Sequence, residues 1–480
     1  MLGSFFQTRH AGVNQRLKTT EDLAMPRKSM STLALTAAAV GLVASTIPAA
    51  GQTVPQPIPV VASGAFAVDS LVALAFERSP TVREAVQRVT AARARIGPSG
   101  ALPDPMLGVG IRNVPIRDPG LGDFMTMTTV GIGQRLPFPG KLPLATRVAE
   151  LEVQAAEAQL QATRVDLAAA VRKAYYDLAF FDGSLGVVER NQTLLLTLAQ
   201  VTVSRYAAGS GGQQDVLEAR LDAAGLTEEV IVLAEARRAT LAGLNALLDR
   251  PSETPVENPH IPEAITRAAV AASPERIRFT SATVGARVAD SPVPQLEDLQ
   301  HRAIVNSPVL RAHEDEVAAQ AARLELARKA HLPDFDLSIE YGQRVDNADM
   351  LSFMVSVPIP VHRAARQDQG IAEARADLSA MEAGHHAMVN ELNAEVAGLH
   401  ADIERTRAQL ALFVTSIVPQ GRAALESTTI AFRVGNADLA GVIENQAVLY
   451  DYEIAYLRAL SEFAKGLADL ERVVGAEVLP

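Results

Sequence analysis

Four histidines fall between Pro360 and Pro419, and the imidazole nitrogen is the commonest protein ligand for metal ions. They are His362, His385, His386 and His400. If this segment is helical, neighbouring residues point about 100° apart, so His385 and His386 do not easily share one ion. We therefore interpret these histidines as solvated helix surface and predict no metal site.

Other patterns that would indicate catalysis do not stand out. The chain has no cysteine, which excludes disulfides, zinc–thiolate sites and cysteine nucleophiles. Its glycines form no phosphate-binding pattern. The net charge of −11 argues against a nucleic-acid partner, because phosphate binding needs clustered cations. We predict neither an enzyme nor a bound cofactor.

Acidic residues follow two glycine turns, and the glutamates lie at matching positions. Residues 205–219 read RYAAGSGGQQDVLEA and residues 431–445 read AFRVGNADLAGVIEN, with the turns predicted at Gly209 and Gly435. Glycine permits the backbone reversal that a tight turn between helices requires. The acids are Asp215 and Glu218 in the first stretch and Asp438 and Glu444 in the second. A helix dipole favours acids at such N-termini, so capping and a functional role both remain open.

The two glycine turns belong to a longer internal repeat. ERSPTVREA at 77–85 matches VNSPVLRAH at 305–313, and ALPD at 101–104 matches HLPD at 331–334. Matches in one order with a nearly constant offset indicate a duplicated domain. The predicted organisation is an N-terminal extension and signal peptide at 1–51, an N-terminal segment at 52–69, a first repeat at 70–250, a linker at 251–294, a second repeat at 295–475 and a tail at 476–480.

Each repeat contains two extended runs in which apolar and polar residues alternate. In the second repeat the apolar positions are Phe335, Leu337, Ile339 and Tyr341, then Leu351, Phe353, Val355 and Val357. The first repeat shows the same alternation more weakly at 107–112 and 125–129. A period of two predicts one β-hairpin per repeat with one apolar face. The strands alone fit a membrane barrel and a soluble hairpin covered by helices equally well.

Prolines mark the junction where each second strand gives way to a helix. LPFPGKLP at 136–143 corresponds to VPIP at 357–360. Proline ends strand pairing but is tolerated in the first helical turn. The predicted strand-to-helix junctions are therefore Pro137 and Pro139 in the first repeat and Pro358 and Pro360 in the second. Gly140 permits the change of direction.

Helices occupy most of each repeat. We expect helices over Ser70–Arg95 and Gln295–Lys329, followed by the strands, a very long helix, a glycine turn and a returning helix. The first long helix, Lys141–Ala208, would extend about 100 Å and cannot fold into a compact globule. Its apolar residues form two seams roughly 140° apart. A two-stranded coiled coil needs one seam, whereas a stave in a barrel wall needs two.

Residues 25–52 carry the pattern of an export signal. Arg27 and Lys28 precede an apolar stretch from Thr32 to Ile47, and small residues follow at 48–51. The alternative is a transmembrane helix, but about 20 apolar residues are needed to span a bilayer. We predict a cleavable signal peptide.

Taken together, the duplication, the Ser-Pro helix starts, LPDP, LPFPGKL and the two glycine-turn motifs resemble the TolC-like outer-membrane efflux family over residues 70 to about 475. The resemblance implies a mainly α fold with a small β part. Three copies would form a twelve-stranded β-barrel in outer-membrane lipid, continued by a periplasmic α-helical barrel. The homotrimer would be the exit duct for a periplasmic adaptor and an inner-membrane resistance-nodulation-division pump. LPDP with LPFPGKL is most similar to the branch serving metal-cation pumps.

The resemblance also implies a gate at the periplasmic tip. Acids at the positions of Asp215 and Glu444 lie near the constriction in the family, and three-fold symmetry would make each acid a ring. The family's tyrosine and arginine in the second turn correspond here to Phe432 and Ala437, so its closing bonds are absent or rebuilt through Arg433. The gate candidates are Asp215, Glu218, Asp438, Glu444, Arg433 and Phe432. The alternative is a periplasmic coiled-coil adaptor or scaffold without a membrane barrel.

Overall fold

A computed structural model describes residues 68–117, 120, 122–270, 277–280, 284–288 and 292–479. The predicted signal peptide and almost all of the N-terminal segment lie outside the described residues. All described elements belong to one compact unit, residues 62–480. Among the described residues, no helix is both long and apolar enough to cross a lipid bilayer.

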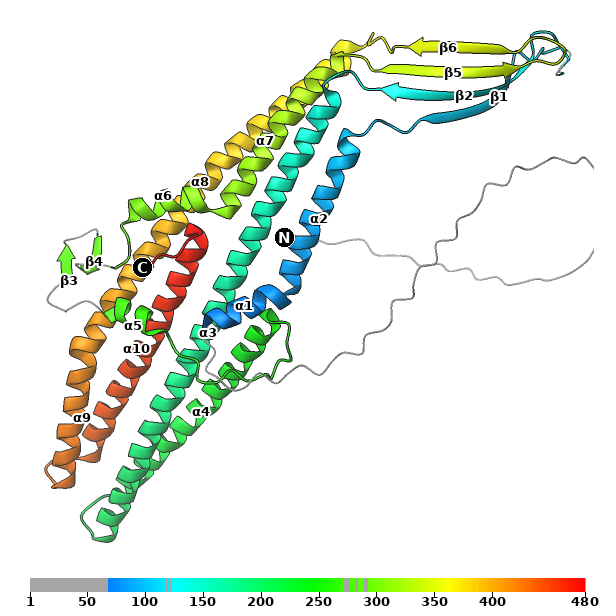
Figure 1. Cartoon of the computed structure of the whole chain (residues 1–480). Coiled ribbons are helices and arrows are strands. Elements are labelled where there is room, and N and C mark those ends of the chain that lie inside the picture. Colours follow the sequence, from blue (N-terminus) through cyan, green and yellow to red (C-terminus); the bar gives the residue numbers. More distant parts are fainter. Residues whose placement is uncertain are drawn as a thin grey trace, which may run out of the picture. The chain divides into compact units, whose positions relative to one another are not determined.

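The two repeats follow the same order of two helices, two strands, a long helical segment and a returning helix, and this long segment is divided into α8 and α9 in the second repeat (Figure 1). The first comprises α1 (Val68–Arg78), α2 (Pro80–Gly100), β1 (Met106–Arg112), β2 (Met127–Leu136), α3 (Lys141–Ala207) and α4 (Gln213–Leu247). The second comprises α6 (Leu296–Asn306), α7 (Pro308–Arg328), β5 (Phe335–Gln343), β6 (Met350–Ser356), α8 (Gln367–Leu412), α9 (Val418–Arg433) and α10 (Leu439–Val474). The predicted duplication is confirmed at the level of the fold.

The prediction of one continuous helix at the start of each repeat is wrong, because the chain forms two helices there. The breaks lie at Ser79 and Ser307, whose ψ angles of 127° and 116° are extended. A proline ring clashes with a helical residue before it, so Pro80 and Pro308 each begin a new helix. The Ser307 hydroxyl caps its helix by accepting from the Leu310 N–H at 3.4 Å.

The predicted long helix is confirmed as α3, which has 67 residues and spans about 100 Å. It packs along α2, α4, α7 and α10. Leu151 and Ala155 of one seam are buried, and so are Val153 and Leu167 of the other. This helix therefore has neighbours on both sides, as the two seams predicted.

The corresponding helix of the second repeat is interrupted. Arg363–Ala365 form a short 3₁₀ helix, and α8 begins only at Gln367. His362 therefore precedes α8 and does not lie on it. Beyond α8, a π-helical turn at Phe413–Ile417 leads into α9, and Pro419 occupies the first turn of α9. The chain stays helical through this region, so Pro419 removes one backbone hydrogen bond, and the π-helical turn lies directly before it.

The four long strands form one antiparallel sheet in the order β1-β2-β5-β6. Each repeat supplies one hairpin, as predicted, and β2 pairs with β5, so that Ile132 lies opposite Ile339. The sheet lies at the opposite end of the helices from the two glycine turns (Figure 1). β2 ends at Leu136, immediately before Pro137, and Gly140 precedes α3 with a φ of 92°.

Between the repeats, the proline-rich stretch contains short elements that its composition did not indicate. They are α5 (Glu263–Val270) and the hairpin of β3 (Ile277–Thr280) with β4 (Val284–Val288). Ala268 and Ala269 of α5 are buried in the core formed by α6, α8 and α10. The fully buried Arg407 donates from Nε to the Ala268 carbonyl at 3.2 Å, so α5 is anchored on α8.

Candidate functional site: an apolar sheet face and a helical tip

One face of the sheet is apolar and exposed on all four strands. Residues directly opposite in an antiparallel pair project to the same face, so Val109, Val130 and Tyr341 share a face by register. The exposed fractions on this face range from 39% to 74%. Its members are Leu107, Val109, Ile111, Val130, Ile132, Leu337, Ile339, Tyr341, Leu351, Phe353 and Val355. The alternation read from the sequence thus becomes one continuous apolar surface.

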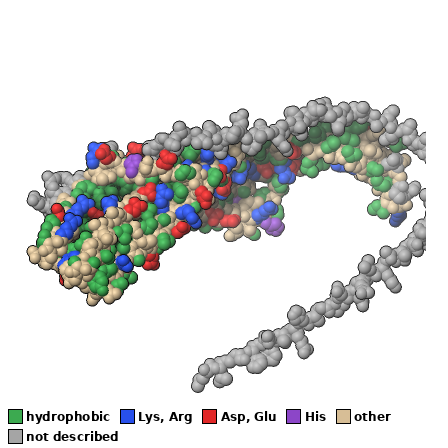
Figure 2. Space-filling view, turned by 90° about the horizontal axis from the view of Figure 1, so that it is seen from below, with side chains coloured by type: hydrophobic (Ala, Val, Ile, Leu, Met, Phe, Trp, Pro, Cys, Tyr) green, Lys and Arg blue, Asp and Glu red, His purple; other side chains and the backbone are tan. Residues whose placement is uncertain are grey.

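The opposite face of the sheet carries its glycines and charged residues together with three exposed methionines, Met106, Met350 and Met354. Ser338 and Ser352 lie on it, and Gly131 lies between the two hairpins. Two ion pairs cross between strands, Arg112 with Glu340 and Arg135 with Asp336, the latter at 2.8 Å. Figure 2 shows mainly uncharged side chains over the strands, on the right, and mixed acidic and basic side chains along the helices. The sheet therefore separates an uncharged face of mainly branched and aromatic side chains from a face that carries all the charged residues of its four strands.

The outer strands β1 and β6 each pair on one side only within the described sheet. An unpaired strand edge presents free N–H and C=O groups and readily accepts another strand. Open edges combined with an exposed apolar face are unfavourable for a single copy in water. The sheet is therefore suited to pair with further copies in an apolar medium.

At the strand-to-helix junction, Asp334 connects the two repeats. Its carboxylate accepts from the Phe138 N–H at 3.0 Å and from Lys141 Nζ at 2.7 Å. Lys141 Nζ also donates to the Leu332 carbonyl at 2.7 Å. Burial would raise the pKa of Asp334, but these hydrogen bonds outweigh it and hold the pKa below the ordinary 3.8. A charged Asp334 thus holds the start of α3 against the segment that leads into β5.

Replacing Asp334 with asparagine is expected to lower the melting temperature at neutral pH, because a charge-assisted contact worth about 1 to 2 kcal/mol is lost. A depressed pKa adds stability that is complete above pH 3.8 and disappears as the pH falls through the lower folded pKa. The wild type and D334N should therefore converge in acid when melting is followed by circular dichroism. The matched control is Asp104→Asn at the equivalent, exposed position of the first repeat. An equal shift at every pH would contradict the ionic role.

The two glycine turns at the other end of the helices have the same geometry. Gly209 and Gly435 have φ angles of 75° and 81°, in the left-handed region that favours glycine. The Gly209 N–H donates to the Tyr206 carbonyl at 3.0 Å, and the Gly435 N–H donates to the Phe432 carbonyl at 3.1 Å. Each turn thus closes a long helix and lets the next one return beside it.

Two of the four acids at this tip cap helices. Asp215 accepts from the Gly212 N–H at 3.3 Å, and Asp438 accepts from the Gly441 N–H at 3.0 Å. Glu218 is half-buried and Glu444 is exposed, and neither forms an ion pair or side-chain hydrogen bond within the described part of the chain. One acid per turn therefore has a structural role, while Glu218 and Glu444 are available to meet ions or partners.

A contact between Arg205 and Phe432 joins the two turns. The Arg205 guanidinium lies 4.8 Å from the ring centroid of Phe432 and donates to its carbonyl at 3.3 Å. The Phe432 ring is 2% exposed and packs with Leu195 and Leu198 of α3. Arg433, in contrast, is exposed and has no side-chain partner among the described residues. The sequence did point to an arginine at the tip, but the contact between the repeats comes from Arg205, four residues before Gly209.

The histidines lie mostly apart from one another. His385 is not simply solvated surface as we expected, because its ring stacks on His313 of α7 with centroids 5.7 Å apart. Within the described ranges, no group of three or more His, Cys, Asp or Glu side chains is placed to hold a metal ion. The histidine pair therefore acts as a packing contact between α7 and α8.

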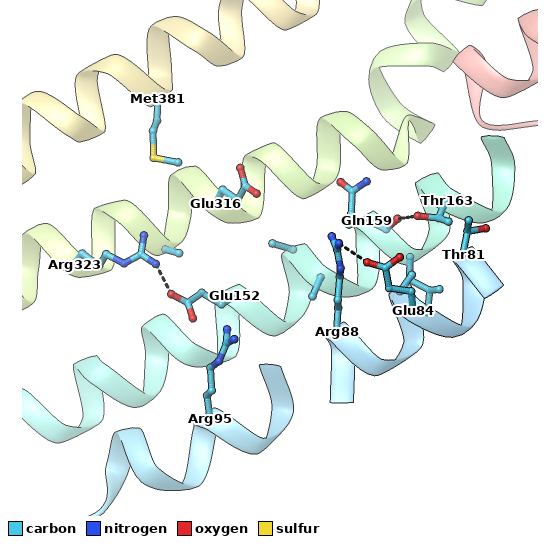
Figure 3. A pocket seen from close by; sticks show the side chains of 15 residues that line it. Thr81, Glu84, Arg88, Arg95, Glu152, Gln159, Thr163, Glu316, Arg323 and Met381 are labelled. Carbon is cyan, nitrogen blue, oxygen red and sulfur yellow. Dashed lines mark hydrogen bonds and ion pairs between the residues drawn. The ribbon is translucent and has the colours of Figure 1, made fainter. Parts of the chain in front are cut away.

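A groove of about 590 Å³ lies between α2, α3, α7 and α8 (Figure 3). Four of its charged side chains form two ion pairs, Arg88 with Glu84 at 2.6 Å within α2 and Arg323 of α7 with Glu152 of α3, while Arg95 and Glu316 also line it. Alanines such as Ala155 and Ala319 form its base. The groove holds no nucleophile beside a base, so its chemistry is that of helix packing.

Comparison with known proteins places this arrangement in a family. The model of the family described as "Outer membrane efflux protein" matches residues 71–250 and 299–476. Protein CyaE of Bordetella pertussis is 27% identical over 351 residues, which cover 70% of this chain and 68% of that protein.

Two solved structures share the fold. The outer membrane protein VceC from Vibrio cholerae superposes with a TM-score of 0.69 at 20% identity, covering 86% of this chain and 96% of that one. CusC superposes with a TM-score of 0.68 at 15% identity, covering 85% of this chain and 92% of that one. The chain belongs to the outer membrane efflux protein family.

Proposed function

We propose that this chain is the outer-membrane exit duct of a tripartite efflux system and works as a homotrimer. The observation that carries the proposal is the exposed apolar face of a four-stranded sheet with two open edges. Four strands cannot enclose a pore, since membrane barrels begin at about eight strands. Three copies would supply twelve strands if β6 of each copy pairs with β1 of the next.

In this assembly the apolar face meets lipid and the polar face lines the pore. Ser338, Ser352 and the ion pairs Arg112–Glu340 and Arg135–Asp336 then stay hydrated. The long helices continue the pore as a tunnel in the periplasm. α3, with neighbours on both sides, is suited to be a stave of the tunnel wall.

The tip is the proposed docking end for a periplasmic adaptor, which links the duct to an inner-membrane pump of the resistance-nodulation-division class. Large apolar side chains are exposed around the turns, namely Tyr206, Leu217, Leu221 and Val434. Exposed apolar groups gathered at one end are typical of a protein interaction surface. The LPDP and LPFPGKL motifs favour metal cations as the exported substrate.

The alternative of a periplasmic scaffold without a membrane barrel is less well supported. The family match runs through both hairpins as well as the helices. In a soluble protein, helices would be expected to cover the apolar face of the hairpins. Here Leu107 and Phe353 on that face are 74% and 71% exposed.

The test is ion conductance by the purified protein in planar bilayers, with Glu444→Gln as the informative variant. In a trimer Glu444 would form a ring of three carboxylates, which attracts cations. We expect the wild type to conduct with a preference for cations, and E444Q to conduct with a weaker preference and an unchanged trimer. Glu426→Gln, an exposed acid on α9, is the control. No conductance would contradict the duct, whereas unaltered selectivity in E444Q would leave Glu444 as helix surface.

A further inference from the structure

The apolar alternation of β6 continues beyond the end of the strand. β6 ends at Ser356, yet Val357, Ile359 and Val361 extend the odd-numbered series of Phe353 and Val355. Ile359 and Val361 are 79% and 78% exposed, more than any apolar residue of the strand itself. Pro358 and Pro360 favour extended backbone at the residue before each of them, and the Val361 N–H donates to the Ile359 carbonyl at 2.9 Å, which closes a γ-turn at Pro360. The apolar surface thus reaches from the sheet toward the helices.

Cationic side chains follow directly. His362, Arg363 and Arg366 are exposed. Arg363 shares Asp368 with His331, at 3.5 Å and 3.2 Å, respectively. The Arg366 side chain makes no ion pair or hydrogen bond among the described residues. An exposed apolar segment followed directly by cations is the pattern by which side chains anchor at a membrane surface.

A hollow of about 450 Å³ lies beside this segment, within the second repeat, and is closed on one side by Lys141 of the first repeat with its partner Asp334. Ile359 and Arg366 line it, together with Lys141, His331 and Gln367. Gln367 Oε1 and His331 Nδ1 are buried yet make no hydrogen bond within the described residues. Buried polar atoms are normally paired, so these two are suited to contact the polar part of a bound molecule.

We propose that residues 357–366 and this hollow bind phospholipids with anionic headgroups on the helix side of the membrane. Val357, Ile359 and Val361 lie among the acyl chains, while Arg363 and Arg366 contact the headgroup phosphate. Headgroup hydroxyls can donate to Gln367 Oε1. The inference rests on the proposed function, because it continues a sheet face that meets lipid. Lipid binding at this segment would set how deeply the duct is inserted in the membrane, with the membrane surface at the helix end of the sheet.

The depth is tested with nitroxide labels on single cysteines, since the chain has no cysteine of its own. Labels at V361C, F353C and S356C are compared in reconstituted vesicles by their collision rates with oxygen and with a nickel chelate. We expect V361C to resemble F353C, with frequent oxygen and rare nickel collisions. Nickel access as frequent as at S356C would overturn the proposal. Protection from both reagents would show that a second copy covers the segment, which also overturns it.

The headgroup is tested with spin-labelled phosphatidylglycerol in vesicles of phosphatidylethanolamine. Arg366→Gln is expected to weaken association of the labelled lipid about fivefold, since a cation near the membrane surface contributes about that factor. The double variant R363Q/R366Q should weaken it further. Arg220→Gln, an exposed arginine on α4 without a side-chain partner among the described residues, should bind as the wild type does. Unchanged binding by the double variant would overturn the assignment of the headgroup site.

The two proposals fail in different ways. If F353C itself is open to the nickel chelate, the sheet does not meet lipid, and both the duct and the lipid site are wrong. If F353C is buried in lipid but V361C is not, the duct stands and the lipid site alone is wrong.

Discussion

Replacing Leu337 or Val355 with arginine is expected to block membrane assembly far more than the same change at Ser338 or Ser356. Leu337 and Val355 lie opposite each other on the apolar face. A cation on the lipid face of a barrel destabilises it by about 2–4 kcal/mol at mid-bilayer. On the polar face the same cation stays hydrated beside the ion pairs of Arg112 and Arg135.

Assembly is measured as heat-resistant trimer recovered from outer membranes. The serine variants serve as matched controls, because Ser338 directly follows Leu337 in β5 and Ser356 directly follows Val355 in β6. Equal assembly of both pairs would show that no lipid contacts the sheet, and poorer assembly of the serine variants would show that the facing of the sheet is reversed.

The second large effect is expected at the tip, where Phe432→Ala should raise single-channel conductance. The ring is 2% exposed and carries the contact with Arg205. Truncating a buried phenylalanine costs about 3–5 kcal/mol, and here the loss falls where the two turns are joined. Freed from each other, the helix ends should separate more often.

Two further variants show which part of this contact matters. Phe432→Leu keeps most of the packing but removes the ring face, so conductance should rise less than in F432A. Val434→Ala, at a position 66% exposed, is the control and should behave as the wild type does. Faster hydrogen exchange around residues 205–212 should accompany F432A. Wild-type conductance in F432A would show that this contact does not restrain the tip.

The sequence predicted those features that depend on local periodicity. The period-two alternation at Leu337, Ile339 and Tyr341 identified the exposed face of β5, and the proline-free stretch after Pro143 identified α3. The same reasoning failed at Ser79 and Ser307. The apolar pattern continues through each Ser-Pro pair, whereas the helix breaks there and a new helix begins at the proline. Proline acts on the residue before it, and hydrophobic periodicity does not register that restriction.

Long-range contacts could not be predicted from one sequence. The register of β2 on β5 joins residues such as Arg135 and Asp336, which lie 201 positions apart. The contact of Arg205 with Phe432 likewise depends on two helix ends lying side by side. The LPD motif did mark Asp334, but only the structure shows that it holds Lys141 and Phe138 of the other repeat.

The central claim is that β1 of one copy pairs with β6 of the next to close a barrel of three copies. Because the chain has no cysteine, V109C and L351C introduce the only two thiols. V109C lies on β1 and L351C on β6, and within one copy β2 and β5 lie between these two strands. At the usual strand spacing the two thiols of one copy are about 14 Å apart. A short bismaleimide should therefore link only different copies. The measurement is the mass of the cross-linked protein from outer membranes under denaturing conditions. We predict linked dimers and trimers and nothing larger. Unlinked chains only, or a ladder that extends beyond three, would contradict the closed trimer.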